Sequence, residues 1–166
     1  MDLSFEEFDQ VLLDQKSRII HQVWFGTIPN KREARKAYAK LKTYRDSWII
    51  KNPTWYRVEW NKTMSLTLVK THYPEYLDMY KRYKFDIQRC DAVRYFMLHR
   101  YGGLYADMDY TCCRPFDEVL ADYPGNFYLV QSPNYASGTG TSNSLMYSMP
   151  GHVFWRKLFP VMEKEQ

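Results

Sequence analysis

The stretch that decides the fold lies at residues 101–109 and reads Tyr-Gly-Gly-Leu-Tyr-Ala-Asp-Met-Asp. Gly102 and Gly103 end the helical pattern before them, and the alternation of apolar and polar residues after them predicts a strand over residues 104–109. Because successive side chains of a strand point to opposite faces, we expect Tyr105, Asp107 and Asp109 to share one face at the carboxyl end of that strand. Ligands of α/β sheets bind at that end, so the stretch predicts a binding site.

The two aspartates predict a metal site. Neighbouring carboxylates repel each other and favour a hard cation, and their oxygen atoms suit Mg²⁺ or Mn²⁺. A metal ion held there can neutralise the charge of a departing diphosphate. A bare Asp-x-Asp is a short pattern, however, and is more often a solvated strand end. The surrounding motifs therefore have to decide between the two interpretations.

Outward from this stretch, helical and strand patterns alternate along the chain. Upstream we expect a helix at 4–13 opened by a capping box of Ser4 and Glu7, a strand at 18–25, a helix at 31–50, a strand at 55–60, helical structure at 65–82 interrupted at Pro74, and a helix at 88–101. Downstream we expect a strand at 127–131, a mobile loop at 132–142 and a helix at 152–162. This order predicts an α/β domain that spans residues 1–166.

Composition is that of a folded, moderately basic protein. The chain has 166 residues, of which 45% are hydrophobic and 17% aromatic, and a formal net charge of +4. The basic residues are scattered except at 31–42, which reads first as the solvated face of a helix. Three cysteines fit neither a disulfide framework nor a zinc spacing. The N-terminal residues lack a signal sequence and no stretch is long enough to cross a membrane, so we expect a soluble, cytoplasmic chain.

A second polar pair lies on the predicted helix that precedes the central stretch. Asp91 and Arg94 are three residues apart and therefore share a helix face. The pair is either an intrahelical ion pair of small energetic value or a binding site in which Asp91 accepts from sugar hydroxyls and Arg94 donates to sugar or phosphate oxygens.

Three motifs together resemble the glycosyltransferases that carry a DXD sugar-binding region. The motifs are Ile-His-Gln-Val-Trp-Phe-Gly at 20–26, Arg-x-Asp-x-x-Arg-Tyr at 89–95 and Tyr-Gly-Gly-x-Tyr-x-Asp-x-Asp at 101–109. This family includes yeast-type initiating α-1,6-mannosyltransferases, inositol-phosphoceramide mannosyltransferases and viral and bacterial capsular-polysaccharide enzymes. The resemblance covers residues 18–159. It implies a GT-A fold, which is a Rossmann-like, nucleotide-sugar-binding α/β fold whose mixed sheet is flanked by helices, and it implies transfer with retention of anomeric configuration.

The resemblance also implies roles for individual residues. Trp24 would stack on the nucleotide base, and Asp91 and Arg94 would hold the donor sugar. Asp107 would meet the ribose or sugar and the metal shell, and Asp109 would bind the metal, Mn²⁺ or Mg²⁺, directly. Two further residues resemble the family at the donor site, namely Tyr105 and Asn143. The stretch 150–155 resembles its post-sheet segment, in which the role of His152 stays open.

The donor is expected to be a nucleotide-sugar, and a UDP-sugar is favoured over GDP-mannose because the base rests on a single tryptophan and backbone contacts. The acceptor, a glycan, lipid or protein, is left open. Family members generally continue beyond the point that corresponds to Gln166, which favours either a truncated piece or a minimal enzyme. The alternative function is therefore a remnant that binds nucleotide and metal without efficient transfer. A metal-dependent nuclease or phosphatase is less well supported because two aspartates are too few ligands, and no motif indicates nucleic-acid binding.

Overall fold

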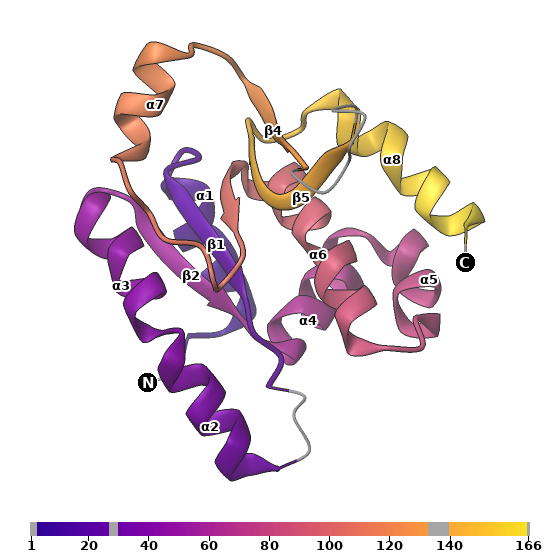
Figure 1. Cartoon of the computed structure of the whole chain (residues 1–166). Helices are drawn as coiled ribbons and strands as arrows, with labels where there is room; N and C mark the ends of the chain where they lie inside the picture. Colours follow the sequence, from indigo (N-terminus) through magenta and orange to yellow (C-terminus); the bar gives the residue numbers. More distant parts are fainter. Residues whose placement is uncertain (1–2, 27–29, 133–139, 166) are drawn as a thin grey trace.

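A mixed five-stranded sheet forms the centre of the molecule (Figure 1). The computed structural model describes residues 3–26, 30–132 and 140–165. Strand order is β2-β1-β3-β5-β4, and the bounds are β1 (Ile19–Val23), β2 (Tyr56–Trp60), β3 (Gly103–Ala106), β4 (Phe127–Gln131) and β5 (Thr141–Ser148). β1 pairs in parallel with β2 and β3, whereas β5 runs antiparallel to β3 and β4. The predicted α/β class with a mixed sheet is confirmed.

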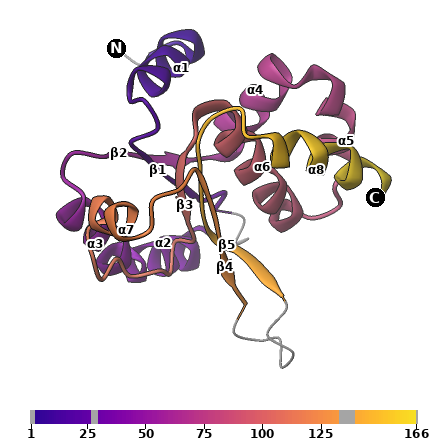
Figure 2. The ribbon, with the colours of Figure 1, turned by 90° about the horizontal axis from the view of Figure 1, so that it is seen from above.

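Helices cover both faces of this sheet (Figure 2). One face carries α4 (Lys62–His72), the short 3₁₀ turn η1 (Pro74–Tyr76), α5 (Leu77–Arg82), α6 (Asp86–Tyr101) and α8 (Val153–Lys164), with α1 (Phe5–Asp14) at its end. The other face carries α3 (Lys42–Lys51) and α7 (Phe116–Asp122), and α2 (Lys31–Lys40) precedes α3. Two separate apolar cores result, one on each side of the sheet. Within the described residues, no helix has the length and apolar character needed to cross a bilayer.

Several predicted boundaries are confirmed by the capping contacts. Ser4 and Glu7 form the capping box of α1, Asn52 ends α3, and Pro74 begins η1 where the helical region is interrupted. The predicted single helix at 31–50 is wrong, because the chain forms α2 and α3 with a break at Leu41. The N–H of Leu41 bonds to the carbonyl of Tyr38, three residues back, which tightens and ends α2.

Two strand predictions also need correction. The predicted loop at 132–142 is wrong at its end, because Thr141 and Ser142 are the first residues of β5. Residues 133–139 of the predicted loop lie outside the described part of the chain. The first half of β5 is polar, so its strand character comes from pairing with β4 rather than from propensity. The strand predicted at 104–109 ends at Ala106. A turn follows in which the N–H of Tyr110 bonds to the carbonyl of Asp107.

The Gly-Gly pair allows β3 to start close against its neighbours. Gly102 and Gly103 have φ values of 66° and 92°, a region that favours glycine. A Cβ on Gly103 would lie 2.5 Å from the carbonyl oxygen of Ile19, on β1. A Cβ on Gly102 would lie 2.7 Å from Pro150. The two glycines are therefore required by the packing of β3, independently of any ligand.

The carbonyl of Gly102 is also held by a buried histidine. Nε2 of His21 donates to that carbonyl at 2.9 Å, and Nδ1 of His21 accepts from the indole N–H of Trp60 at 3.0 Å. These contacts describe a neutral imidazole with its proton on Nε2. Burial lowers the pKa of His21 from 6.5 to about 4, so the histidine links β1, β2 and the start of β3 as an uncharged group.

We expect Gly103→Ala to destabilise the fold more than Gly151→Ala. Gly151 also has a positive φ, of 70°, but a Cβ there would meet nothing within 4 Å. Gly151→Ala should lower the free energy of unfolding by about 1–2 kcal/mol through backbone strain alone. Gly103→Ala adds the clash with Ile19 and should cost about 1–3 kcal/mol more. Urea denaturation of both variants measures the difference, and equal losses would show that the close approach of β3 to β1 is unimportant.

The buried His21 should make the fold sensitive to acid. Its pKa is lowered from 6.5 to about 4 in the folded chain, so the unfolded chain binds the proton first. Stability contributed by the neutral form is present above pH 6.5 and should be lost by about 3 kcal/mol as the pH falls to 4. In His21→Gln, which keeps a donor and an acceptor, the free energy of unfolding should change less over this window. Equal pH dependence in both proteins would refute the assignment.

Candidate functional site

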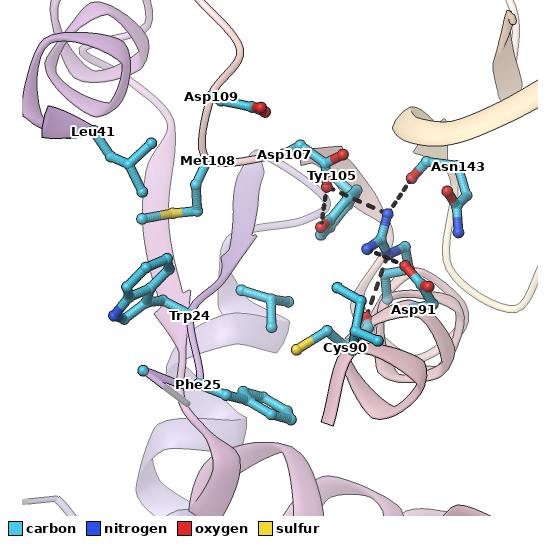
Figure 3. A pocket seen from close by; sticks show the side chains of 14 residues that line it. Trp24, Phe25, Leu41, Cys90, Asp91, Tyr105, Asp107, Met108, Asp109 and Asn143 are labelled. Carbon is cyan, nitrogen blue, oxygen red and sulfur yellow. Dashed lines mark hydrogen bonds and ion pairs between the residues drawn. The ribbon is translucent and has the colours of Figure 1, made fainter. Parts of the chain in front are cut away.

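A pocket of about 470 Å³ opens where β1 and β3 end, next to α6. Figure 3 shows its lining. The structure brings all of the predicted site residues to this pocket: Trp24 after β1, Asp91 and Arg94 on α6, Tyr105 on β3, Asp107 and Asp109 after β3, and Asn143 on β5. The volume lies within the range of about 300–1,000 Å³ that is typical of small-molecule sites.

Arg94 is the centre of a polar cluster along one wall of the pocket. Its side chain is only 5% exposed. Nη1 donates to the carbonyl of Asn143 at 2.7 Å and lies 3.3 Å from Oδ1 of Asp107. Nη2 donates to Oδ1 of Asp91 at 2.6 Å, and Nε donates to the carbonyl of Cys90 at 3.3 Å. The predicted shared helix face of Asp91 and Arg94 is confirmed, and the pair is more than a surface ion pair because one partner is buried.

Oδ1 of Asp107 is contacted by both Tyr105 and Arg94. The hydroxyl of Tyr105 donates to this oxygen at 2.7 Å, and Nη1 of Arg94 lies 3.3 Å from it. The guanidinium of Arg94 also lies 4.4 Å from the centre of the Tyr105 ring. Burial raises the pKa of Asp107 despite the opposing effect of Arg94. The ionised carboxylate is thus incompletely compensated by the protein, and a cation at its other oxygen would stabilise it.

Asp109 stands apart from the Arg94 cluster (Figure 3). Because β3 ends at Ala106, neither Asp107 nor Asp109 is a strand residue, so the prediction that Tyr105, Asp107 and Asp109 share one strand face is wrong. Asp109 is exposed, and within the described residues it makes no hydrogen bond or ion pair. Its carboxylate is free to bind a ligand from the pocket.

Asp107 and Asp109 supply part of a metal coordination shell. The described residues contain no group of three or more His, Cys, Asp or Glu side chains placed to hold an ion. Mg²⁺ is commonly held by one or two carboxylates plus substrate phosphates and water. The exposed Asp109 and the undercompensated Asp107 fit that arrangement, in which a diphosphate would complete the coordination.

An aromatic wall faces the charged cluster. Trp24 is half-buried, and its ring lies 5.7 Å from that of Tyr38. The Trp24 backbone is held by an N–H bond to the Trp60 carbonyl at 2.9 Å. Leu41 and Met108 lie on the same side of the pocket (Figure 3). Trp24 therefore belongs to the pocket and not to the core, which leaves its indole face available for a flat ligand.

Some lining residues were not predicted, although several stand next to predicted ones. They are Val23, Phe25, Gly26, Leu41, Ile87, Cys90 and Met108. Phe25 lies within the motif at 20–26 and Cys90 within the motif at 89–95. Their positions in these motifs could have identified them as pocket residues. Burial raises the pKa of the Cys90 thiol to about 12, so this cysteine is a neutral wall residue and not a nucleophile.

His152, whose role the sequence left open, has a structural role away from the pocket. Its Nδ1 caps α8 by accepting from the N–H of Phe154 at 3.3 Å. Its ring stacks on that of Phe127, with centroids 4.6 Å apart.

Comparisons with known proteins agree with the motifs. The model of a glycosyltransferase sugar-binding region containing a DXD motif matches residues 39–125. A mannosyl phosphorylinositol ceramide synthase of Saccharomyces cerevisiae is 40% identical over 114 residues, which cover 69% of this chain and 28% of that protein. An inositol phosphoceramide mannosyltransferase of Schizosaccharomyces pombe is 31% identical over 147 residues, covering 89% of this chain and 38% of the relative.

A viral relative extends the comparison beyond fungi. An uncharacterized glycosyltransferase of Acanthamoeba polyphaga mimivirus is 28% identical over 149 residues, covering 87% of this chain and 54% of that protein. The chain spans only about 28% and 38% of the two fungal relatives. No solved structure matches the chain significantly. The family model covers more than half of the chain and includes all three aspartates of the pocket, so the chain belongs to the glycosyltransferase family that has a sugar-binding region with a DXD motif.

Proposed function

We propose that this chain is the donor-binding part of a metal-dependent, retaining glycosyltransferase that moves a hexose from a nucleotide diphosphate sugar to an acceptor. The observation that carries the proposal is the pocket itself, in which a half-buried tryptophan faces a guanidinium and three carboxylates. Flat bases stack on aromatic rings, sugar hydroxyls bind carboxylates, and diphosphates bind cations. Family membership supports a donor site over a general anion site.

Each wall of the pocket has a separate task in the proposed reaction. Trp24 supports the base, and Asp91 and Arg94 hold the sugar. Asp107 and Asp109 hold Mn²⁺ or Mg²⁺, which when bound neutralises charge on the leaving diphosphate. In the transfer, the bond between the anomeric carbon and the diphosphate breaks, and the nucleotide diphosphate leaves with the electron pair. The acceptor oxygen bonds to that carbon on the face from which the diphosphate departs, and its proton passes to an oxygen of the departing diphosphate.

The protein residues mainly position the donor. Arg94 is already bonded to four protein groups, so it orients Asp91 and Asp107 as well as facing the ligand. Asp91 is 45% exposed and can accept from a sugar hydroxyl while it keeps its ion pair. A fixed arrangement of this kind lowers the entropy that binding would otherwise cost.

The sugar and the base of the donor are separate questions. The sequence alone favours a UDP-sugar, whereas the names of the fungal relatives state a mannosyl product or mannosyltransferase activity. We therefore propose mannose as the transferred hexose and keep both GDP-mannose and UDP-sugars as donors to be tested. The names also mention phosphorylinositol ceramide and inositol phosphoceramide, which favours a lipid among the proposed acceptors. Cytoplasmic location stays a prediction.

The alternative is a remnant that binds nucleotide and metal without efficient transfer. Hydrolysis of the sugar nucleotide in the presence of Mn²⁺ separates the two, because a remnant would bind the donor without turning it over.

Asp109→Asn should abolish Mn²⁺-dependent binding of a nucleotide diphosphate, because the exposed carboxylate is the direct metal ligand in this proposal. Asp107→Asn should weaken that binding as well. Calorimetry with GDP and UDP, each with and without Mn²⁺, measures the effect. Asp78→Asn is the matched control, because Asp78 is exposed on α5 outside the pocket and the charge change is the same. Unchanged metal-dependent affinity in both pocket variants would refute the metal site.

Asp91→Ala should distinguish a sugar-binding carboxylate from a structural ion pair. If Asp91 accepts from a donor-sugar hydroxyl, its loss should weaken binding of the sugar nucleotide by about ten- to a hundredfold. Binding of the free nucleotide diphosphate, which lacks the sugar, should change much less. The ratio of the two affinities in wild type and variant is the measurement. An unchanged ratio would assign the Asp91–Arg94 pair to the support of the fold.

A further inference from the structure

Helix α2 carries the whole excess of positive charge of the chain. Of the 23 basic and 19 acidic residues in the sequence, α2 holds five and one, so the remaining residues contain 18 of each. The formal net charge of +4 therefore belongs to a helix of 10 residues. The basic residues of this helix are Lys31, Arg32, Arg35, Lys36 and Lys40.

The five cations form one face of α2. Successive residues of an α-helix are about 100° apart, so these five side chains fall within one half of the helix circumference. All five are exposed, whereas Ala34, Ala37 and Tyr38 on the other half are only partly exposed. Figure 1 shows α2 at an outer edge of the molecule, next to α3. The basic half of α2 therefore faces the solvent.

The fold makes no use of these cations. Within the described residues, none of the five side chains forms an ion pair, whereas Lys42, just after α2, is paired with Asp46. The other half of the helix holds α2 in place. The hydroxyl of Tyr38 donates to Oε2 of Glu59 at 3.0 Å, and the guanidinium of Arg45 lies 4.2 Å from the centre of the Tyr38 ring.

The spacing of the cations destabilises the helix when it is alone. Arg32 and Lys36 are four residues apart, and the same spacing separates Lys31 from Arg35 and Lys36 from Lys40. Like charges at this spacing repel each other across one turn of a helix. A negatively charged partner along this face would remove the repulsion. The arrangement therefore indicates an anionic surface that extends along the helix, over a length of about 15 Å.

A bilayer fits this face better than a nucleotide or a nucleic acid does. None of the five cations lines the donor pocket, so they do not hold the donor diphosphate. Proteins that bind single-stranded nucleic acid place aromatic rings among their cations, whereas the ring of Tyr38, the one aromatic residue of α2, lies against Trp24 and Arg45. Clusters of about four to eight Lys and Arg residues on a helix bind the anionic headgroups of a bilayer.

We propose that α2 docks this chain on a bilayer surface rich in anionic phospholipids. The basic half of α2 has no large apolar side chain, so the contact is made with headgroups and without insertion into the acyl chains. Leu41, the residue after α2, lines the donor pocket, and docking therefore brings the rim of that pocket to the membrane surface. The inference is independent of the proposed function, because vesicle binding requires no nucleotide.

The experiment is co-sedimentation of the chain with vesicles of phosphatidylcholine, with and without phosphatidylserine. The wild type should bind only the vesicles that contain phosphatidylserine, and added salt should weaken this binding because it screens the charges. The double variant Arg32→Gln, Lys36→Gln should bind about twenty- to thirtyfold more weakly, since each basic residue near an anionic surface contributes about fivefold in affinity.

The matched control is the double variant Arg156→Gln, Lys157→Gln on α8. It removes the same charge from two exposed residues that form no ion pair within the described residues, and it should bind the vesicles nearly as the wild type does. Calorimetry with GDP or UDP plus Mn²⁺ should give the same affinity for the wild type and for the α2 variant, because neither Arg32 nor Lys36 lines the donor pocket.

The inference is overturned if the wild type does not bind the anionic vesicles, or if the α2 variant and the α8 variant lose equal affinity. It is also overturned if poly(U) binds the wild type more tightly than the anionic vesicles do, which would assign the basic face to nucleic acid. Should the first α2 variant fail to fold, Lys31→Gln with Lys40→Gln takes its place. A wild type that binds no nucleotide would refute the proposed function and leave the vesicle result unaffected.

Discussion

The rest of the site depends on the burial of the Arg94 guanidinium. A buried cation is tolerated only when its donors are bonded and its charge is offset. The partners of Arg94 come from α6 itself, from β5 and from the turn after β3, and the ring of Tyr105 lies beneath the charge. Satisfying this one side chain therefore fixes how three elements meet. The half-exposed carboxylate of Asp91 is then held toward the pocket by this buried cation.

A second set of constraints sets the position of β3 itself. Gly102 and Gly103 let the chain turn sharply from α6 and run close to β1. The neutral imidazole of His21 donates a hydrogen bond to the Gly102 carbonyl. The Tyr-Gly-Gly part of the central stretch thus has a structural explanation in backbone clearance, whereas its Asp-Met-Asp part has none in packing, because Asp109 is exposed and unpaired within the described residues. The motif at 101–109 therefore combines residues that the packing of β3 requires with residues that the packing does not require.

Sequence reasoning was most successful where local chemistry determines structure. The Ser4 capping box, the end of α6 at Gly102 and the shared face of Asp91 and Arg94 follow from short-range rules, and all are present. It failed where distant pairing decides. β5 is a strand because it lies between β3 and β4, although its first residues resemble a loop. The same limit applies to the pocket: Leu41 and Ile87 line it because of how helices pack, and no sequence pattern marks them.

The contact between Arg94 and position 143 is made to a backbone carbonyl, whereas the side chain of that residue faces Tyr95. A carbonyl is supplied by any amino acid. The bond from Arg94 therefore does not depend on which amino acid stands at position 143. A substitution at position 143 can therefore change the contact with Tyr95 while the bond to Arg94 remains.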